Sequence, residues 1–163
     1  MKKLLIIALL PLLNGCVFTS YKGPETKSYA TVTIKTSNLE ENILLPDQYL
    51  NFGVIKKVFG GKNVDLGAFQ LKGKDTSRTI SIDADKPMIL QAAMIVSVYG
   101  GNDSSIAEHQ VQLKKNANYE YVVNCNYAVD CVFRMSQIVG DEHQVIYNER
   151  FSWHGLRVKL IRY

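Results

Sequence analysis

Residues 119–139, "YEYVVNCNYAVDCVFRMSQIV", decide the fold that this sequence predicts. Two apolar segments meet at a pair of cysteines, and the five residues "NYAVD" separate Cys125 from Cys131. Antiparallel pairing that sets these cysteines opposite each other also sets apolar residues opposite each other on one face: Val123 with Phe133, and Tyr121 with Met135. The cysteines, the apolar pattern and the loop length therefore predict one β-hairpin with one register.

The same spacing predicts a disulfide bond between Cys125 and Cys131. Opposed residues in an antiparallel pair have Cα atoms about 4.5–5.5 Å apart, which is within disulfide range. Closing so short a loop stabilises a fold by about 2.4 kcal/mol in the chain-entropy model. Two alternatives stay open, namely two reduced and buried cysteines, or a metal site that adds a histidine, although CxxC-type spacing is absent.

Short apolar segments with β-branched residues recur from residue 29 onward, and glycine, asparagine, aspartate and proline turns separate them. The predicted strands cover 29–36, 52–59, 65–71, 78–83, 88–99, 106–113, 119–125, 131–139, 143–151 and 156–163. Strands of this number and spacing predict an all-β chain, an antiparallel β-sandwich of transthyretin-like or immunoglobulin-like type. A helix is the alternative for 88–99, and 37–50 has room for a helical turn or two, limited by Pro46.

The N-terminus has the features of an export signal. Met1-Lys2-Lys3 is followed by ten residues without a charge, about half of the roughly 20 that a membrane-spanning helix needs. The signal ends in Leu13-Asn14-Gly15-Cys16, which resembles the lipobox of bacterial lipoproteins, with Asn14 where alanine or serine is commoner. In that family the cysteine receives a diacylglyceryl group, the chain is cut just before it, and the new amino group is acylated.

The resemblance implies that Cys16 is the lipidation site. A plain secretory signal with an unrelated cysteine, or a cysteine buried in a core helix, is the alternative. By resemblance to enterobacterial sorting, Val17 after the cysteine, in place of aspartate, implies the outer membrane. The expected location is the bacterial cell envelope, lipid-anchored at the outer membrane and facing the periplasm, where disulfides persist.

These features predict three parts of the chain. Residues 1–15 form the signal peptide, 16–28 the lipidated cysteine and a tether, and 29–163 a single β-sandwich domain. Residues 17–28, "VFTSYKGPETKS", are largely polar and reach at most about 40 Å when extended.

The charge balance argues against a nucleic-acid partner. The net charge of +4 includes two lysines that would leave with residues 1–15, and the mature chain would then be nearly neutral, with no basic run. The expected partners are the membrane, through Cys16, and another protein of the envelope.

A second, looser resemblance covers residues 80–139. The stretches "ISIDADKPMIL", "VQLKKNANYEYVVNC" and "CVFRM" are similar to those of small, mostly uncharacterised bacterial envelope lipoproteins, with Asn116 and Ala117 in place of the glycine usual before Tyr119. This resemblance implies a β-sandwich at the cell envelope. In size, anchor and fold class the chain also resembles the type VI secretion lipoprotein, whose interaction loop is not recognisable in this sequence.

No motif for catalysis is present, whether a nucleophile elbow, an H-E-x-x-H zinc motif, a P-loop or a dinucleotide fingerprint. His109, His143 and His154 fall on separate strands or turns, so we expect no buried cluster that unites a histidine with a carboxylate and a hydroxyl. Ser152 and His154 share a face only through their spacing of two, and we interpret His154 as a strand-end residue.

We therefore predict a non-enzymatic envelope lipoprotein that binds or supports another envelope component, without catalytic residues, metal or cofactor. The predicted partner surface is an exposed aromatic patch: Tyr49, Phe52, Tyr99 and Trp153. The alternatives are the accessory lipoprotein of a secretion machine and, with less support, an envelope carbohydrate binder or hydrolase.

Overall fold

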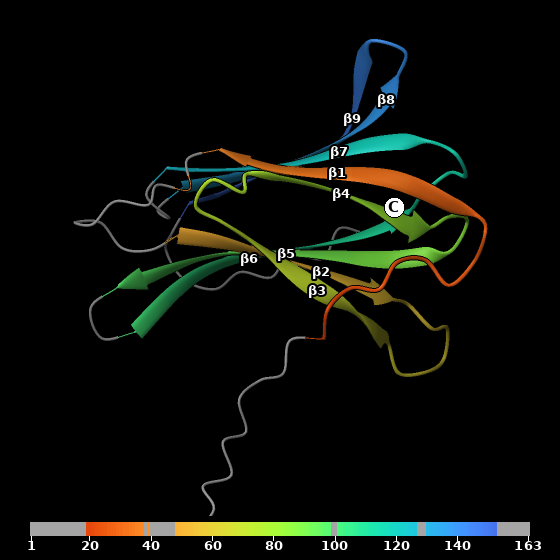
Figure 1. The fold of residues 1–163 in the computed structure, drawn as a ribbon, viewed down its shortest axis with the longest axis horizontal. Coiled ribbons are helices and arrows are strands. Elements are labelled where there is room, and N and C mark those ends of the chain that lie inside the picture. The colour runs from red at the N-terminus through yellow and green to blue at the C-terminus, as the bar shows by residue number, and fades with distance from the viewer. Residues whose placement is uncertain (1–18, 38, 40–47, 99–100, 127–129, 153–163) are drawn as a thin grey trace, which may run out of the picture.

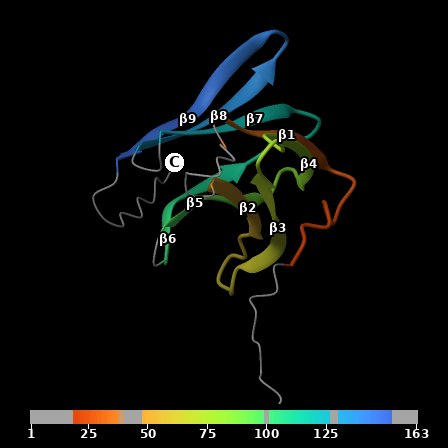
Figure 2. The same cartoon turned by 60° about the vertical axis from the view of Figure 1, so that its left-hand side comes forward.

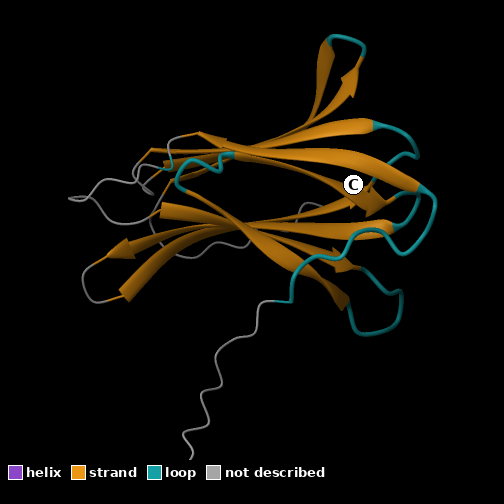
Figure 3. Ribbon diagram, in the orientation of Figure 1, coloured by secondary structure: helices purple, strands orange, loops and turns teal. Residues whose placement is uncertain are grey.

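The computed structural model describes residues 19–37, 39, 48–98, 101–126 and 130–152, and in those ranges it contains nine strands and no helix. The strands are β1 (Tyr29–Ser37), β2 (Gln48–Lys56), β3 (Val64–Lys72), β4 (Ser77–Asp83), β5 (Pro87–Val98), β6 (Gly101–Gln112), β7 (Asn118–Asn126), β8 (Asp130–Val139) and β9 (Glu142–Ser152). They form two sheets packed face to face, so the predicted β-sandwich is confirmed (Figures 1 and 3).

The larger sheet has the strand order β4-β1-β7-β8-β9, and the smaller sheet has the order β3-β2-β5-β6. Figure 2 shows the two sheets as separate layers, with the smaller sheet below. Every named strand pair is antiparallel except β1 with β7, where Val32 lies opposite Tyr119 in a parallel ladder. Because β1 pairs with β4 on one side and with β7 on the other, this first strand occupies an interior position in the larger sheet.

The hairpin of β7 and β8 has the predicted register. Cys125 lies opposite Cys131, and the pairing continues without a shift to Asn118 opposite Ile138. The residues of the predicted inward face are buried: Tyr119, Tyr121, Val123, Cys125, Cys131, Phe133 and Met135. Because a slip of one residue would turn this whole apolar set toward solvent, the burial pattern holds the register in place.

The core lies between the sheets and follows the period of two along each strand. In β1, Ala30, Val32 and Ile34 are fully buried while the residues between them are not. Phe52 of β2 and Tyr121 of β7 meet edge to face across the core, with ring centroids 5.2 Å apart. Each such side chain contributes about 1.5–3 kcal/mol when fully buried.

The observed strand boundaries correct two expectations. Residues 88–98 belong to β5, so the alternative of a helix there is wrong. β2 runs from Gln48 to Lys56, so Val58 and Phe59, expected at a strand end, lie in the turn before β3. The stretches 40–47 and 156–163 lie outside the described residues.

Candidate functional site

The N-terminal strap, residues 19–28, lies on the open side of the sandwich between the edge strands β3 and β4 (Figure 1). In β3, the Ala68 N–H donates to the Thr19 carbonyl at 2.8 Å, and the Ala68 carbonyl accepts from the Tyr21 N–H at 3.2 Å. The Tyr21 hydroxyl donates to the Ser81 carbonyl of β4 at 2.6 Å. The strap thus ties the two sheets together, and the predicted tether is shortened because the domain already binds the chain at Thr19.

A glycine lets the strap approach β3 closely. Gly67 has φ +109°, and a Cβ at this position would lie 2.7 Å from both the Thr19 carbonyl oxygen and the Tyr21 nitrogen. The Asp65 carboxylate accepts the Gly67 N–H at 2.8 Å and fixes this unusual backbone. Any larger residue at position 67 would separate the strap from the sheet.

A buried carboxylate holds the far end of the strap. Asp83, the last residue of β4, is fully buried and accepts hydrogen bonds from the Thr26 hydroxyl at 2.6 Å and the Thr26 N–H at 3.0 Å. Burial alone would raise the pKa of Asp83, but the bonds from Thr26 and the charge of Lys86 outweigh it, so the pKa is lowered. The carboxylate stays ionised at neutral pH and fastens the strap.

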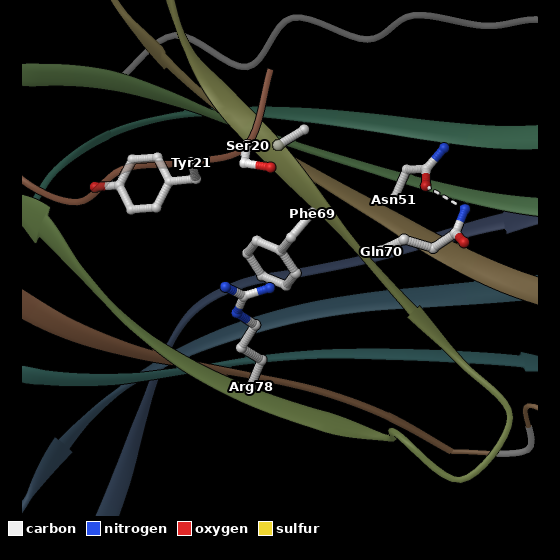
Figure 4. A pocket seen from close by; sticks show the side chains of 7 residues that line it. Ser20, Tyr21, Asn51, Phe69, Gln70 and Arg78 are labelled. Carbon is white, nitrogen blue, oxygen red and sulfur yellow. Dashed lines mark hydrogen bonds between the residues drawn. The ribbon is translucent and has the colours of Figure 1, made fainter. Parts of the chain in front are cut away.

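A shallow pocket of about 350 Å³ opens beside the strap (Figure 4). Its lining comes from the strap, β2, β3 and β4: Ser20, Tyr21, Asn51, Ala68, Phe69, Gln70 and Arg78. The Gln70 amide donates to Asn51 at 3.1 Å, and the Arg78 guanidinium lies over the Phe69 ring, 4.5 Å from its centroid (Figure 4). These amides and the guanidinium suit a ligand rich in hydrogen-bonding groups. None of the seven is a histidine, cysteine or carboxylate, and the Tyr21 hydroxyl already donates to the Ser81 carbonyl, while burial raises its pKa to about 12. The lining therefore favours binding over proton transfer.

On the opposite open side, between β6 and β9, the structure contradicts the expectation that no histidine joins a carboxylate and a hydroxyl. His109 of β6 is buried, with Nδ1 2.7 Å from the Tyr121 hydroxyl and Nε2 3.6 Å from the Glu149 carboxylate. Its ring also stacks on Tyr147 at a centroid distance of 4.7 Å. Histidines that are far apart in the sequence can still find partners across a sandwich, and sequence separation alone could not exclude this cluster.

The chemistry of the cluster favours a structural role. Burial lowers the pKa of His109, and the nearby Glu149 offsets only part of that shift. Burial also raises the pKa of Tyr121 well above its ordinary value, so both rings are neutral at pH 7. When the neutral His109 ring carries its proton on Nε2, Nδ1 accepts a hydrogen bond from the Tyr121 hydroxyl, and the Nε2–H faces the Glu149 carboxylate at 3.6 Å. The rings of His109, Tyr121 and Tyr147 are all buried, which suits packing within the core.

The predicted disulfide is present. Cys125 and Cys131 are bonded, with Cα atoms 4.1 Å apart, and both residues are buried. The alternatives of reduced cysteines and of a cysteine metal site are therefore wrong. His143 instead faces Glu120 at 3.5 Å, and no group of three metal-ligating side chains occurs in the described ranges.

One of the four residues of the predicted aromatic patch is not at the surface, and two others lie outside the described residues. Phe52 is fully buried in the core against Phe69 and Tyr121, so it cannot belong to an exposed surface. Tyr49 is half-buried in β2, while Tyr99 and Trp153 lie outside the described residues.

Other apolar side chains are exposed instead, and sequence reasoning missed them. Phe59 in the β2–β3 turn is 94% exposed, and Val139, Val145 and Ile146 are exposed on the β8–β9 hairpin. The signal for Phe59 was the sequence "KKVFGGK", in which lysines and a pair of glycines surround an aromatic residue.

Cys16, Ser152 as a side chain and His154 lie outside what the structure describes, so the lipidation site and the Ser–His pair remain sequence predictions. Within the described ranges, no helix has the length and apolar character needed to cross a bilayer.

Comparison of the chain with protein-family models, with curated proteins and with solved structures gives no match.

Proposed function

We propose that this protein is a non-enzymatic lipoprotein of the bacterial cell envelope, a β-sandwich anchored through lipid on Cys16 that binds or supports another envelope component. The observation that carries the proposal is the signal sequence ending in Leu13-Asn14-Gly15-Cys16, followed after two residues by the strap. The disulfide between Cys125 and Cys131 supports it, because such bonds persist in oxidising compartments.

The distribution of chemical groups favours binding over catalysis. The pocket beside the strap has no histidine, cysteine or carboxylate in its lining, and the rings of His109, Tyr121 and Tyr147 are buried in the core. Two acyl chains or more hold a protein stably at a membrane, whereas one holds it only marginally, so full processing at Cys16 would give a lasting anchor.

The β8–β9 hairpin is the surface best suited to the protein partner. Its tip turns away from the rest of the larger sheet (Figure 1). Val139, Val145 and Ile146 are 46%, 58% and 37% exposed there. Gly140, with φ +62°, begins the two-residue turn that joins the strands of this hairpin. Apolar side chains on a projecting hairpin gain free energy when a partner covers them.

The anchor is tested by replacing Cys16→Ser in the full chain and labelling cells with a radioactive fatty acid. The unchanged protein should be labelled and shortened by the signal peptide, and the variant should remain an unlabelled precursor. Asn14→Ser is the matched control, because serine is commoner at that lipobox position and should leave processing intact. A Cys16→Ser protein that is still cut and still membrane-bound would refute the anchor.

The partner surface is tested by placing a photo-crosslinking amino acid at Val145 in the lipidated protein within intact cells. A discrete crosslinked envelope protein is expected. The control is the same amino acid at Lys74, an exposed residue of the β3–β4 turn, which should give no such product. Equal crosslinking at both positions, or none at Val145, would argue against the hairpin as the binding surface.

A further inference from the structure

The β2–β3 turn, residues 57–63, presents a phenyl ring to solvent. The Gly61 N–H donates to the Val58 carbonyl at 3.3 Å, which places Phe59 and Gly60 at the tip. Gly60 has φ +69°, the positive value that a type II turn requires at its third residue. Phe59 is 94% exposed and Val58 is 37% exposed, so the tightest part of this turn displays apolar surface.

The turn and the start of the strap lie on the same side of the molecule. Ser20 bridges Ala68 in the parallel sense, so the chain direction from Tyr21 back to Thr19 points toward the first residues of β3, where the turn ends. In both Figure 1 and Figure 2, the β2–β3 turn and the beginning of the strap lie at the lower edge, beyond the smaller sheet. The β8–β9 hairpin lies at the upper edge in both views.

The short segment between Cys16 and Thr19 limits the distance between the start of the strap and the bilayer that would hold a lipidated Cys16. Only Val17 and Phe18 separate Cys16 from Thr19, and three residue steps span at most about 11 Å. Val64, where the turn meets β3, lies four residues before Ala68, which contacts the strap. Four strand steps cover about 13 Å, a distance similar to the span from Thr19 to Cys16.

The charges near the tip fit an anionic surface. Lys57 precedes the tip, with its Nζ donating to the Gln110 side chain of β6 at 2.6 Å, and the exposed Lys62 follows the tip. Lys56 is already paired with Glu25 at 2.6 Å, and Asp65 is the nearest acidic residue after the turn. Lys57 and Lys62 thus lie within three residues of Phe59 along the chain, and anionic headgroups attract such cations while the ring enters the interface.

We propose that the β2–β3 turn is a second membrane contact, in which Phe59 enters the headgroup region of the bilayer that holds the acylated Cys16. This inference rests on the proposed lipid anchor and deepens it. Two contacts on one side fix the orientation of the domain, with the smaller sheet toward the lipid and the β8–β9 hairpin directed away from it. A binding hairpin held at the far side is free to meet a partner.

The contact is tested with the full lipidated chain carrying Trp153→Phe and Phe59→Trp. The purified protein is reconstituted in vesicles of phosphatidylethanolamine and phosphatidylglycerol, with or without brominated acyl chains. The tryptophan at position 59 should emit at shorter wavelength in vesicles than in detergent-free solution, and brominated lipid should quench most of its emission. The matched control is Val145→Trp in the same background, whose emission should be insensitive to bromine. Mass spectrometry of the same preparation reads the acylation of Cys16.

A second variant measures the contribution of the ring. Phe59→Ser should speed transfer of the lipidated protein between vesicles by about tenfold or more, as expected when a buried phenyl ring is lost. In the Phe59→Trp protein, vesicles without phosphatidylglycerol should weaken the quenching by bromine.

The outcomes separate the two proposals. An unquenched tryptophan at position 59 in a chain that carries acyl groups overturns the turn contact and leaves the anchor in place. A quenched tryptophan there in a chain without acyl groups refutes the anchor but supports the turn contact. Emission from position 59 that responds to added envelope proteins and not to lipid would overturn the membrane contact and show a protein-binding turn. Equal quenching of the tryptophans at positions 59 and 145 would refute the proposed orientation.

Discussion

The replacement Gly67→Ala should detach the strap from β3. The new Cβ would lie 2.7 Å from two backbone atoms of the strap, which cannot move aside as a flexible side chain can. Holding alanine at φ +109° costs about 1–3 kcal/mol. Loss of the two hydrogen bonds between Ala68 and the strap costs about 0.5–1.5 kcal/mol for each bond. Together these losses predict a free energy of unfolding lower by about 2–6 kcal/mol.

Urea unfolding and limited trypsin digestion measure the two consequences separately. The midpoint of urea unfolding should fall, and cleavage at Lys22 and Lys27 in the strap should become faster under native conditions. Gly53→Ala in the neighbouring strand β2 is the matched control. Its Cβ would have ordinary contacts of 3.7 Å or more, so its stability should change by no more than about 0.5 kcal/mol.

An unchanged urea midpoint for Gly67→Ala, together with strap lysines as resistant as before, would refute this reasoning. Such a result would mean that the strap does not lie against β3 in solution. Equal losses in the Gly53→Ala and Gly67→Ala proteins would show that any side chain harms this sheet, and the close approach of the strap would not be the cause.

Three further predictions concern the disulfide and the buried histidine. Replacing Cys125 and Cys131 together by alanine should lower the free energy of urea unfolding by about 2–3 kcal/mol, and free thiols in the native protein would contradict the bond. Because burial lowers the pKa of His109 from 6.5, the unfolded chain binds this proton more tightly. The stabilisation should therefore be complete above about pH 6.5 and decline below it, whereas thermal melts of His109→Gln should lose that pH dependence. Tyr121→Phe leaves Nδ1 of the histidine without its partner and should cost about 1–3 kcal/mol in the same melts, and an unchanged melting temperature would show that the hydrogen bond is dispensable.

The β7–β8 hairpin could be predicted in detail because three local signals agree within 21 residues. Cysteine spacing, apolar alternation and loop length all act between neighbouring strands, so no knowledge of the rest of the fold is needed. The parallel pairing of β1 with β7 had no such signal. It joins residues 87 positions apart, such as Thr31 and Asn118, and only the packing of the whole sandwich selects it.

Two errors at the candidate site came from signals that the sequence did contain. Leu50, Phe52 and Val54 alternate inward along β2, but a strand expected to begin at residue 52 hides this period. His109 likewise stands between Ala107 and Val111 on the inward face of β6. Its partner Glu149 could not be inferred, because the contact crosses from one sheet to the other.

The parallel ladder between β1 and β7 has a consequence for the order in which the fold can form. β1 begins at Tyr29, yet one of its two neighbours, β7, begins only at Asn118 and is synthesised later. Contacts between distant segments close slowly, because the loop entropy must be overcome before the contacts form. The larger sheet therefore cannot be completed on a growing chain until β7, β8 and β9 have been made. For the exported lipoprotein proposed above, this order would leave the larger sheet incomplete while the chain is still being made.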